Sequence, residues 1–164
     1  MIMTIKRITK LAAVAALYIV FTLINPFSFE MVQFRISEIL ILLCFYRRDY
    51  SYALIVGCFI ANLFGPMGYV DALFGTLATT ISVFLISRSK NLILAGLYPV
   101  LLNGVIVGLE LHYILEFPLL TAMGFVALGE FVVVTTVGVI LFMILTKNDG
   151  FLDLIEANQN LPQH

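Results

Sequence analysis

Apolar residues occur in six long runs along this chain, and short segments rich in polar, charged or turn-forming residues separate the runs. A helix needs about 20 apolar residues to cross a bilayer, with examples from about 17 to 25. The pattern therefore predicts an all-α membrane protein with six transmembrane helices, at Ile8–Ile24, Phe34–Tyr46, Tyr52–Phe64, Val70–Ser87, Leu92–Leu115 and Leu119–Thr146. Because the second and third runs are short, we expect those helices to be shallow or tilted, or to extend into their loops.

The composition supports a single membrane domain. Of the 164 residues, 62% are hydrophobic and 12% are charged, and the mean hydropathy is +1.07, whereas soluble domains contain about 45–50% apolar and about 25% charged residues. We expect a six-helix domain over residues 1–146 and a polar cytoplasmic tail with a short helix over residues 147–164. The net charge of −1 and the lack of a basic patch argue against a nucleic-acid partner.

The lysine and arginine residues predict the orientation. If the N-terminus is cytoplasmic, the six-helix pattern leaves Arg35 outside and brings the other eight basic residues to the cytoplasmic side. Cytoplasmic loops collect Lys and Arg in this way. The chain is therefore expected in the cell membrane with both termini inside, and the eight residues are Lys6, Arg7, Lys10, Arg47, Arg48, Arg88, Lys90 and Lys147.

Polar side chains within the apolar runs are the candidate functional residues. The turn Gly65-Pro66-Met67-Gly68 interrupts the segment 57–80, with Asn62 before the turn and Asp71 after it. An amide or carboxylate at hydrocarbon depth loses its solvation unless another group satisfies it. Glycine-rich breaks between apolar helices are tolerated where the freed backbone is buried in protein or lines a cavity. This segment therefore predicts a ligand cavity.

The last two runs carry further polar residues. Asn103 and Glu110 are seven residues apart, which places them on one helix face, two turns apart. Glu130 lies roughly 16 Å along the sixth helix, at 1.5 Å per residue, where a carboxylate costs about 2.5–3.5 kcal/mol on insertion scales. Two interpretations stay open: a structural pair or protonated, hydrogen-bonded acid, or the wall of a polar cavity.

The outer loop before the second run contains a possible ion pair. Arg35 and Glu38, at positions i and i+3, can pair on one helix face, as a clasp for this loop. Two explanations fit the aromatic residues of the same region, an interfacial belt or stacking on a planar ligand. These residues are Phe27, Phe29, Phe34, Phe64, Tyr69 and Phe74.

Two small residues in the first run suggest a docking surface. Ala12 and Ala16 are four residues apart, and a stripe of small residues lets another helix approach closely. No G-x-x-x-x-G-K-[ST] phosphate loop occurs, so the chain is not expected to hydrolyse ATP itself. With His112 and His164 as its two histidines, the chain predicts neither a histidine-centred metal site nor a cofactor.

Four motifs resemble those of the QueT family, in the same order: Gln33–Glu38 (QFRISE), Gly57–Thr80, Asn103–Leu111 (NGVIVGLEL) and Gly129-Glu130. Members of this family are substrate-binding S-components of energy-coupling factor (ECF) transporters, associated with queuosine precursors. The resemblance implies six helices with a substrate near the outer side. It also implies a transmembrane coupling subunit, which would dock on Ala12 and Ala16, and two ATPase subunits.

The ligand implied by the resemblance is a 7-deazaguanine, such as the 7-aminomethyl or 7-cyano base. Its guanine-like edge offers two adjacent donors that one carboxylate can accept, and an ammonium group would favour a second carboxylate. We expect Glu110 and Glu130 as the leading contacts, supported by Asn62, Asn103 and Asp71, with Glu38 as a lesser candidate.

Three other functions remain open at this point. The chain could bind another small heterocycle, since a fold does not fix its ligand. It could be an intramembrane enzyme with Glu110 and Glu130 as an acid–base pair, although no nucleophile or metal set accompanies them. A purely structural subunit would leave the polar residues unexplained.

Overall fold

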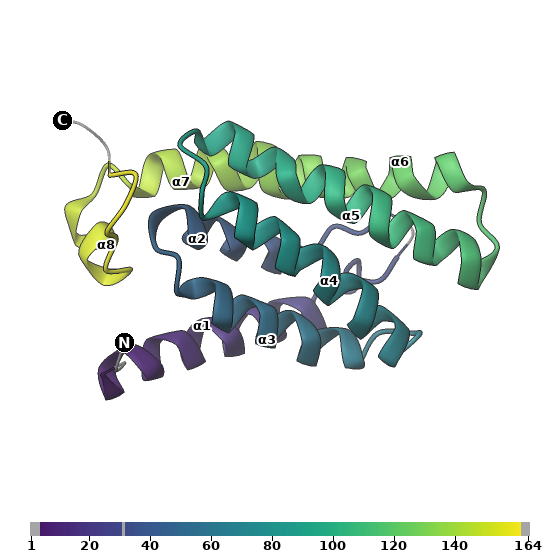
Figure 1. The fold of residues 1–164 in the computed structure, drawn as a ribbon, viewed down its shortest axis with the longest axis horizontal. Coiled ribbons are helices and arrows are strands. Elements are labelled where there is room, and N and C mark those ends of the chain that lie inside the picture. The colour runs from purple at the N-terminus through teal and green to yellow at the C-terminus, as the bar shows by residue number, and fades with distance from the viewer. Residues whose placement is uncertain (1–3, 31, 162–164) are drawn as a thin grey trace.

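The computed structural model describes residues 4–30 and 32–161, and these form an all-helical bundle (Figure 1). Residues 1–3 and 31 of the predicted domain 1–146 lie outside the described residues, as do residues 162–164 of the predicted tail 147–164. The elements are α1 (Ile5–Ile24), η1 (Ile36–Leu42), α2 (Leu43–Tyr46), α3 (Tyr50–Leu63), α4 (Tyr69–Ile86), α5 (Leu92–Leu115), α6 (Leu119–Glu130), η2 (Phe131–Gly138), α7 (Val139–Leu145) and α8 (Asp149–Leu154).

Capping residues explain where two of the long helices begin. The hydroxyl of Thr4 accepts a hydrogen bond from the backbone N–H of Arg7, so α1 starts at Ile5 rather than at the predicted Ile8. The side-chain oxygen of Asn91 accepts from the N–H groups of Ile93 and Leu94, at 2.9 and 3.2 Å. It therefore satisfies two of the amides that the first turn of α5 would otherwise leave unpaired.

The helices pack side by side in a closed arrangement. α1 packs on α3, α3 on α4, α4 on α5 and α5 on α6, while η1 contacts both α1 and η2 and so closes the bundle. Figure 1 shows α8 beside the start of α1, at the end of the bundle away from the α3–α4 turn and the α5–α6 loop. Large apolar side chains cover the outer surfaces of the long helices, for example Leu101, Val105 and Ile140.

Among the described residues, four helices are long and apolar enough to cross a membrane: Ile5–Ile24, Tyr69–Ile86, Leu92–Leu115 and Leu119–Leu145. The second and third predicted helices are shorter apolar helices, over Ile36–Tyr46 and Tyr50–Asn62. In the second, seven 3₁₀ residues and four α residues extend about 20 Å, against a hydrocarbon core of about 30 Å. The segment at 32–35 before it is not helical, so the predicted start at Phe34 is wrong.

The last predicted helix is continuous but not regular. Its middle, Phe131–Gly138, is a π-helix between the α-helical segments α6 and α7. π-Helical turns are rare and frequently occur at functional sites. Here the π-helix begins directly after Glu130, one of the predicted site residues.

The tail packs against the bundle. The predicted short helix is α8, and Ile155, just after it, is buried in the main apolar core with Tyr46 and Phe142. The side chains of Gln159 and Asn160 donate hydrogen bonds to the carbonyl oxygen of Phe45, at 3.1 and 2.8 Å. The tail therefore covers the end of the bundle where α1 begins.

Candidate functional site

The six residues predicted to contact a ligand are all buried inside the bundle rather than facing its apolar outer surface. None is more than 5% exposed. They come from five elements, η1, α3, α4, α5 and α6, and are Glu38, Asn62, Asp71, Asn103, Glu110 and Glu130. Four of them are acidic, so this part of the bundle carries an unusual concentration of carboxyl groups for a membrane protein.

Arg35 is the basic residue at the centre of this group. It is 4% exposed, and its Nε donates to the carbonyl oxygen of Ser28 at 2.9 Å. Its guanidinium lies 5.2 Å from the ring centre of Phe29. Its charge also interacts with those of three acids, Glu38, Glu110 and Glu130. We call Arg35 and the six buried residues around it the Arg35 cluster.

The predicted Arg35–Glu38 clasp is wrong. No ion pair joins the two side chains in the described part of the chain, and the hydroxyl of Tyr18 donates to Oε1 of Glu38 instead. The reason is the backbone: Arg35 has extended dihedral angles and immediately precedes η1, so the two residues do not share a helix face. Arg35 is therefore directed toward Ser28 and the wider cluster.

Glu130 is held by Asn103 across the α5–α6 contact. The Nδ2 of Asn103 donates to Oε1 of Glu130 at 2.9 Å. The preceding residue, Gly129, packs directly on the backbone of Gln33, where an added Cβ would lie 2.9 Å from the Gln33 carbonyl carbon. A side chain at position 129 would thus push the 32–35 segment, and Arg35 with it, away from Glu130.

Asp71 and Glu110 form the second pair of the cluster. Asp71 lies in the first turn of α4, and its Oδ2 accepts from the backbone N–H of Met67 at 2.8 Å. Its carboxyl group is also within side-chain hydrogen-bonding reach of Glu110. Asn103 and Glu110, which the sequence places on one face of α5, therefore contact different partners.

Asn62 connects α3 to this cluster. Its Nδ2 donates to Sγ of Cys58 at 3.2 Å. It lies against Gly75 of α4, where a Cβ would overlap its Nδ2 and would stand 3.8 Å from Nη1 of Arg35. Asn62 and Arg35 thus approach the same small patch of α4.

Buried oxygen atoms without a hydrogen-bond partner are the most informative feature of the cluster. Within the described residues they include Oε2 of Glu38 and of Glu130, Oε1 of Glu110 and Oδ1 of Asn62. Buried polar groups are normally paired, and each exception calls for an explanation. All four atoms are acceptors, so the arrangement is suited to a molecule that presents several donors.

Sequence reasoning missed the two residues that organise these acids. Arg35 was assigned to the wrong role, and Tyr18 was not identified as a site residue. Tyr18 and Thr22 are both about 1% exposed on a helix whose other faces are largely exposed, and the Thr22 hydroxyl lies 2.7 Å from that of Ser37. Two polar side chains four residues apart in an apolar helix were the available signal.

Four of the aromatic residues of this region divide into two sets. Phe27, Phe64 and Tyr69 are 59%, 67% and 82% exposed, as expected for an interfacial belt. Phe29 instead lies beside Arg35 in the cluster. His112 is half-buried, and its Nδ1 lies 2.7 Å from the carbonyl oxygen of Phe117, within the α5–α6 connection. No group of side chains in the described residues is suited to hold a metal ion.

Comparison with known proteins identifies the family. A family model described as QueT transporter matches residues 8–147. The curated protein "Queuosine precursor transporter QueT" from Lactococcus lactis subsp. cremoris (strain MG1363) is 33% identical over 141 residues, covering 76% of this chain and 83% of that protein. No solved structure matches the chain.

These matches narrow the functions that the sequence left open to transport. Both describe transporters, so the prediction of a transporter is confirmed and the enzyme interpretation is set aside. The several apolar helices fit the multi-pass membrane location that a transporter requires. From the family match over residues 8–147 and this architecture, we conclude that the chain belongs to the QueT transporter family.

Proposed function

We propose that this protein is the substrate-binding component of an ATP-driven importer and that it captures a queuosine precursor, a 7-deazaguanine base, from outside the cell. The relative from Lactococcus lactis is named for queuosine precursors. The observation that carries the proposal is the set of unpaired, buried acceptor atoms around Arg35. Each unpaired acceptor costs about 1–3 kcal/mol, and a ligand rich in donors removes that cost.

The charges of the cluster favour such a ligand over an anionic vitamin. Of the four acids, Glu38, Glu110 and Glu130 interact with the charge of one arginine, and Asp71 lies beside Glu110. An anionic ligand would add to the repulsion among these acids, whereas a neutral or cationic base with several N–H groups would reduce it.

The hydrogen bonds within the cluster suggest how the base is held. The adjacent ring N–H and exocyclic amine of a guanine-like edge suit the carboxylate of Glu130, whose Oε2 is free and whose Oε1 Asn103 already holds in place. The ring oxygen requires a donor. Arg35 suits this role better than Asn62 or Asn103, because its bond to Ser28 uses one of five N–H donors, whereas each amide already uses one of two. Phe29, beside Arg35, is available for stacking.

The Asp71–Glu110 pair would then receive the substituent at position 7. Two carboxyl groups in contact repel each other when both are ionised. An aminomethyl group, as an ammonium, donates up to three hydrogen bonds and neutralises part of that charge. In this arrangement Glu38 supports Arg35 and Tyr18 rather than contacting the ligand first.

The transport cycle requires partners, which we propose are a transmembrane coupling subunit and two ATPase subunits of an ECF module. Ala12 and Ala16 are both exposed on α1, while Leu11 and Tyr18 face the bundle. The small-residue stripe is thus available to another helix. We further propose six membrane-spanning segments with both termini cytoplasmic, in which the short helices α3 and η1–α2 span with help from their neighbours.

Binding of the purified protein to the 7-aminomethyl base, measured by isothermal titration calorimetry, tests the site. Glu110→Gln and Glu130→Gln should each weaken binding by at least tenfold, or about 1.4 kcal/mol. Glu116→Gln is the matched control, because Glu116 is exposed in the α5–α6 loop. If both variants bind like the unmodified protein, the site assignment is wrong. Calorimetric titration with other heterocycles distinguishes this ligand from the alternative of a different base or vitamin.

A further inference from the structure

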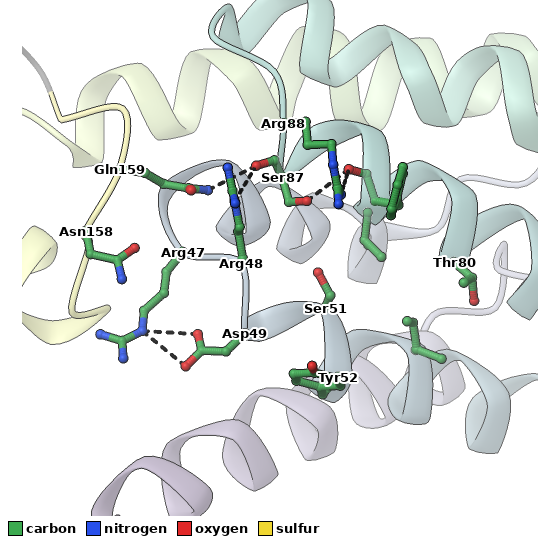
Figure 2. A pocket seen from close by; sticks show the side chains of 13 residues that line it. Arg47, Arg48, Asp49, Ser51, Tyr52, Thr80, Ser87, Arg88, Asn158 and Gln159 are labelled. Atoms are coloured by element: carbon green, nitrogen blue, oxygen red, sulfur yellow. Dashed lines mark hydrogen bonds and ion pairs between the residues drawn. The ribbon is translucent and has the colours of Figure 1, made fainter. Parts of the chain in front are cut away.

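A second polar region lies at the opposite end of the bundle from the Arg35 cluster. A pocket of about 600 Å³ opens there, lined by the α2–α3 turn, the first turns of α3, the last turns of α4 and the segment after α8. Figure 2 shows this pocket, with Arg48 and Arg88 both beside Ser87. The proposed base does not occupy this region, so its chemistry needs a separate explanation.

Two arginines give the pocket a cationic rim. The Nε of Arg48 donates to the carbonyl oxygen of Ser87 at 3.1 Å, and Nη1 of Arg88 donates to that of Phe84 at 3.2 Å. A guanidinium has five N–H donors, so these bonds use a minority of the donors that each side chain carries. Both side chains are exposed.

The acidic residue of the lining does not neutralise this rim. Asp49 accepts from Nε and Nη2 of Arg7, at 2.8 and 2.5 Å, and from Arg47 at 3.1 Å. Its charge is therefore already balanced by two arginines. Arg48 and Arg88 remain as positive charges in the described pocket, arranged to receive an anion.

Part of the lining is apolar, among the neutral polar side chains of Ser51, Thr80 and Gln159. Ile55 of α3 and Val83 and Phe84 of α4 line the pocket. Ile55 is five residues into α3, or about 8 Å from the helix start, and Phe84 is 53% exposed on the outer surface of the bundle. The pocket thus has two cationic side chains beside an apolar wall, with the guanidinium of Arg88 3.5 Å from the ring centre of Phe84, and the wall continues onto the surface that faces lipid.

We propose that this pocket binds an anionic phospholipid, with its phosphate at Arg48 and Arg88 and an acyl chain along Ile55 and Phe84. Arginine binds phosphate through charge-assisted, often bidentate, hydrogen bonds. Basic pockets between transmembrane helices on the cytoplasmic side bind lipid head groups. A free phosphate ion shares the head-group chemistry but would use the rim alone, so the apolar wall favours a lipid.

Native mass spectrometry of the full chain in detergent tests the proposal, with phosphatidylglycerol, phosphatidylcholine and inorganic phosphate as separate probes. We expect phosphatidylglycerol to bind about tenfold more tightly than phosphatidylcholine. The double variant Arg48→Gln/Arg88→Gln should lose this preference. Lys90→Gln/Lys147→Gln is the matched control, because it removes two exposed charges from the same end outside the pocket lining and should retain the preference.

A third variant separates lipid from free phosphate. Ile55→Ser should weaken the binding of phosphatidylglycerol and leave any binding of inorganic phosphate unchanged. Binding of inorganic phosphate without preference for phosphatidylglycerol would overturn the lipid assignment. Equal loss in the pocket variant and the lysine control would also overturn it, because the preference would then come from the general positive charge of this end. Thermal unfolding of each variant shows whether it is folded, and a folded pocket variant that keeps the preference refutes the proposal.

Discussion

The Asp71–Glu110 pair allows the orientation of the proposed ligand to be tested with two bases that differ at one substituent. The 7-aminomethyl base carries an ammonium, whereas the 7-cyano base is neutral at the same position. If the pair receives this substituent, Glu110→Gln should weaken binding of the 7-aminomethyl base much more than binding of the 7-cyano base. Glu130→Gln should weaken both bases similarly, because the edge that Glu130 accepts is common to them.

The structure gives the expected size of the difference. Glu110 has one unpaired oxygen, Oε1, and its carboxyl group also faces Asp71. A hydrogen bond to a charged group contributes about 1.5–3 kcal/mol, which corresponds to roughly 10–150-fold in affinity. Since Asp71 remains in the variant, we expect the lower part of this range for the aminomethyl base. For the cyano base we expect a change of about threefold or less.

Isothermal titration calorimetry of both bases against the unmodified protein, the two variants and the Glu116→Gln control measures these changes. An equal loss for both bases in Glu110→Gln would refute the orientation, while leaving the proposed ligand class intact. Weaker binding of the aminomethyl than of the cyano base to the unmodified protein would also contradict it, because the acid pair should favour the cation.

Three further predictions concern stability, its dependence on pH, and docking. Asp49→Asn removes the carboxylate that Arg7 contacts with two hydrogen bonds, and should destabilise the protein by about 3 kcal/mol, seen as a lower unfolding temperature in detergent; Asp153→Asn, at an exposed acid, should have little effect. Burial raises the pKa of Asp49, but hydrogen bonds and charges from its arginine neighbours outweigh this effect and lower the pKa from its usual 3.8. The stabilisation by Asp49 should therefore be complete above about pH 4 and decline as the pH falls further. Unfolding temperatures that do not change below this pH would contradict the assignment. Substitution of Ala12 and Ala16 by Trp should abolish uptake and leave ligand binding intact, because bulky side chains would keep a partner helix from approaching α1. Loss of uptake and of ligand binding together would indicate misfolding.

The helices were predictable where their conformation depends on requirements that the membrane places on each residue separately. An apolar run identifies α1, α4 and α5 within a few residues. In a membrane, side chains that face lipid are apolar and backbone N–H and C=O groups must pair within the helix. The 3₁₀ segment η1 and the π-helix η2 were not predictable. Their geometry depends on contacts between distant segments, such as Gly129 against the backbone of Gln33.

For the candidate site, the sequence predicted which acids are buried but not which groups they pair with. A carboxylate in an apolar helix is costly wherever it points, so Glu110 and Glu130 are conspicuous in the sequence alone. Which group faces each acid depends on the backbone in between. The spacing of Arg35 and Glu38 predicts a pair only if both residues are helical, and the extended backbone at Arg35 removes that condition.

The Arg35 cluster differs from the ion pairs at the α8 end in how fully its polar groups are paired, and the proposed binding would require this difference. At the α8 end, Arg7, Lys10, Arg47, Asp49 and Glu156 form a connected set of ion pairs. At the Arg35 cluster, four buried acceptors lack partners, at a cost on the order of 4–12 kcal/mol together. That cost is comparable to the whole stability of a typical domain, so it persists only because the rest of the bundle holds these side chains in place. A ligand that satisfies the acceptors recovers part of this free energy on binding, and an incompletely paired cluster in a well-paired bundle is therefore what a high-affinity site for a donor-rich base requires.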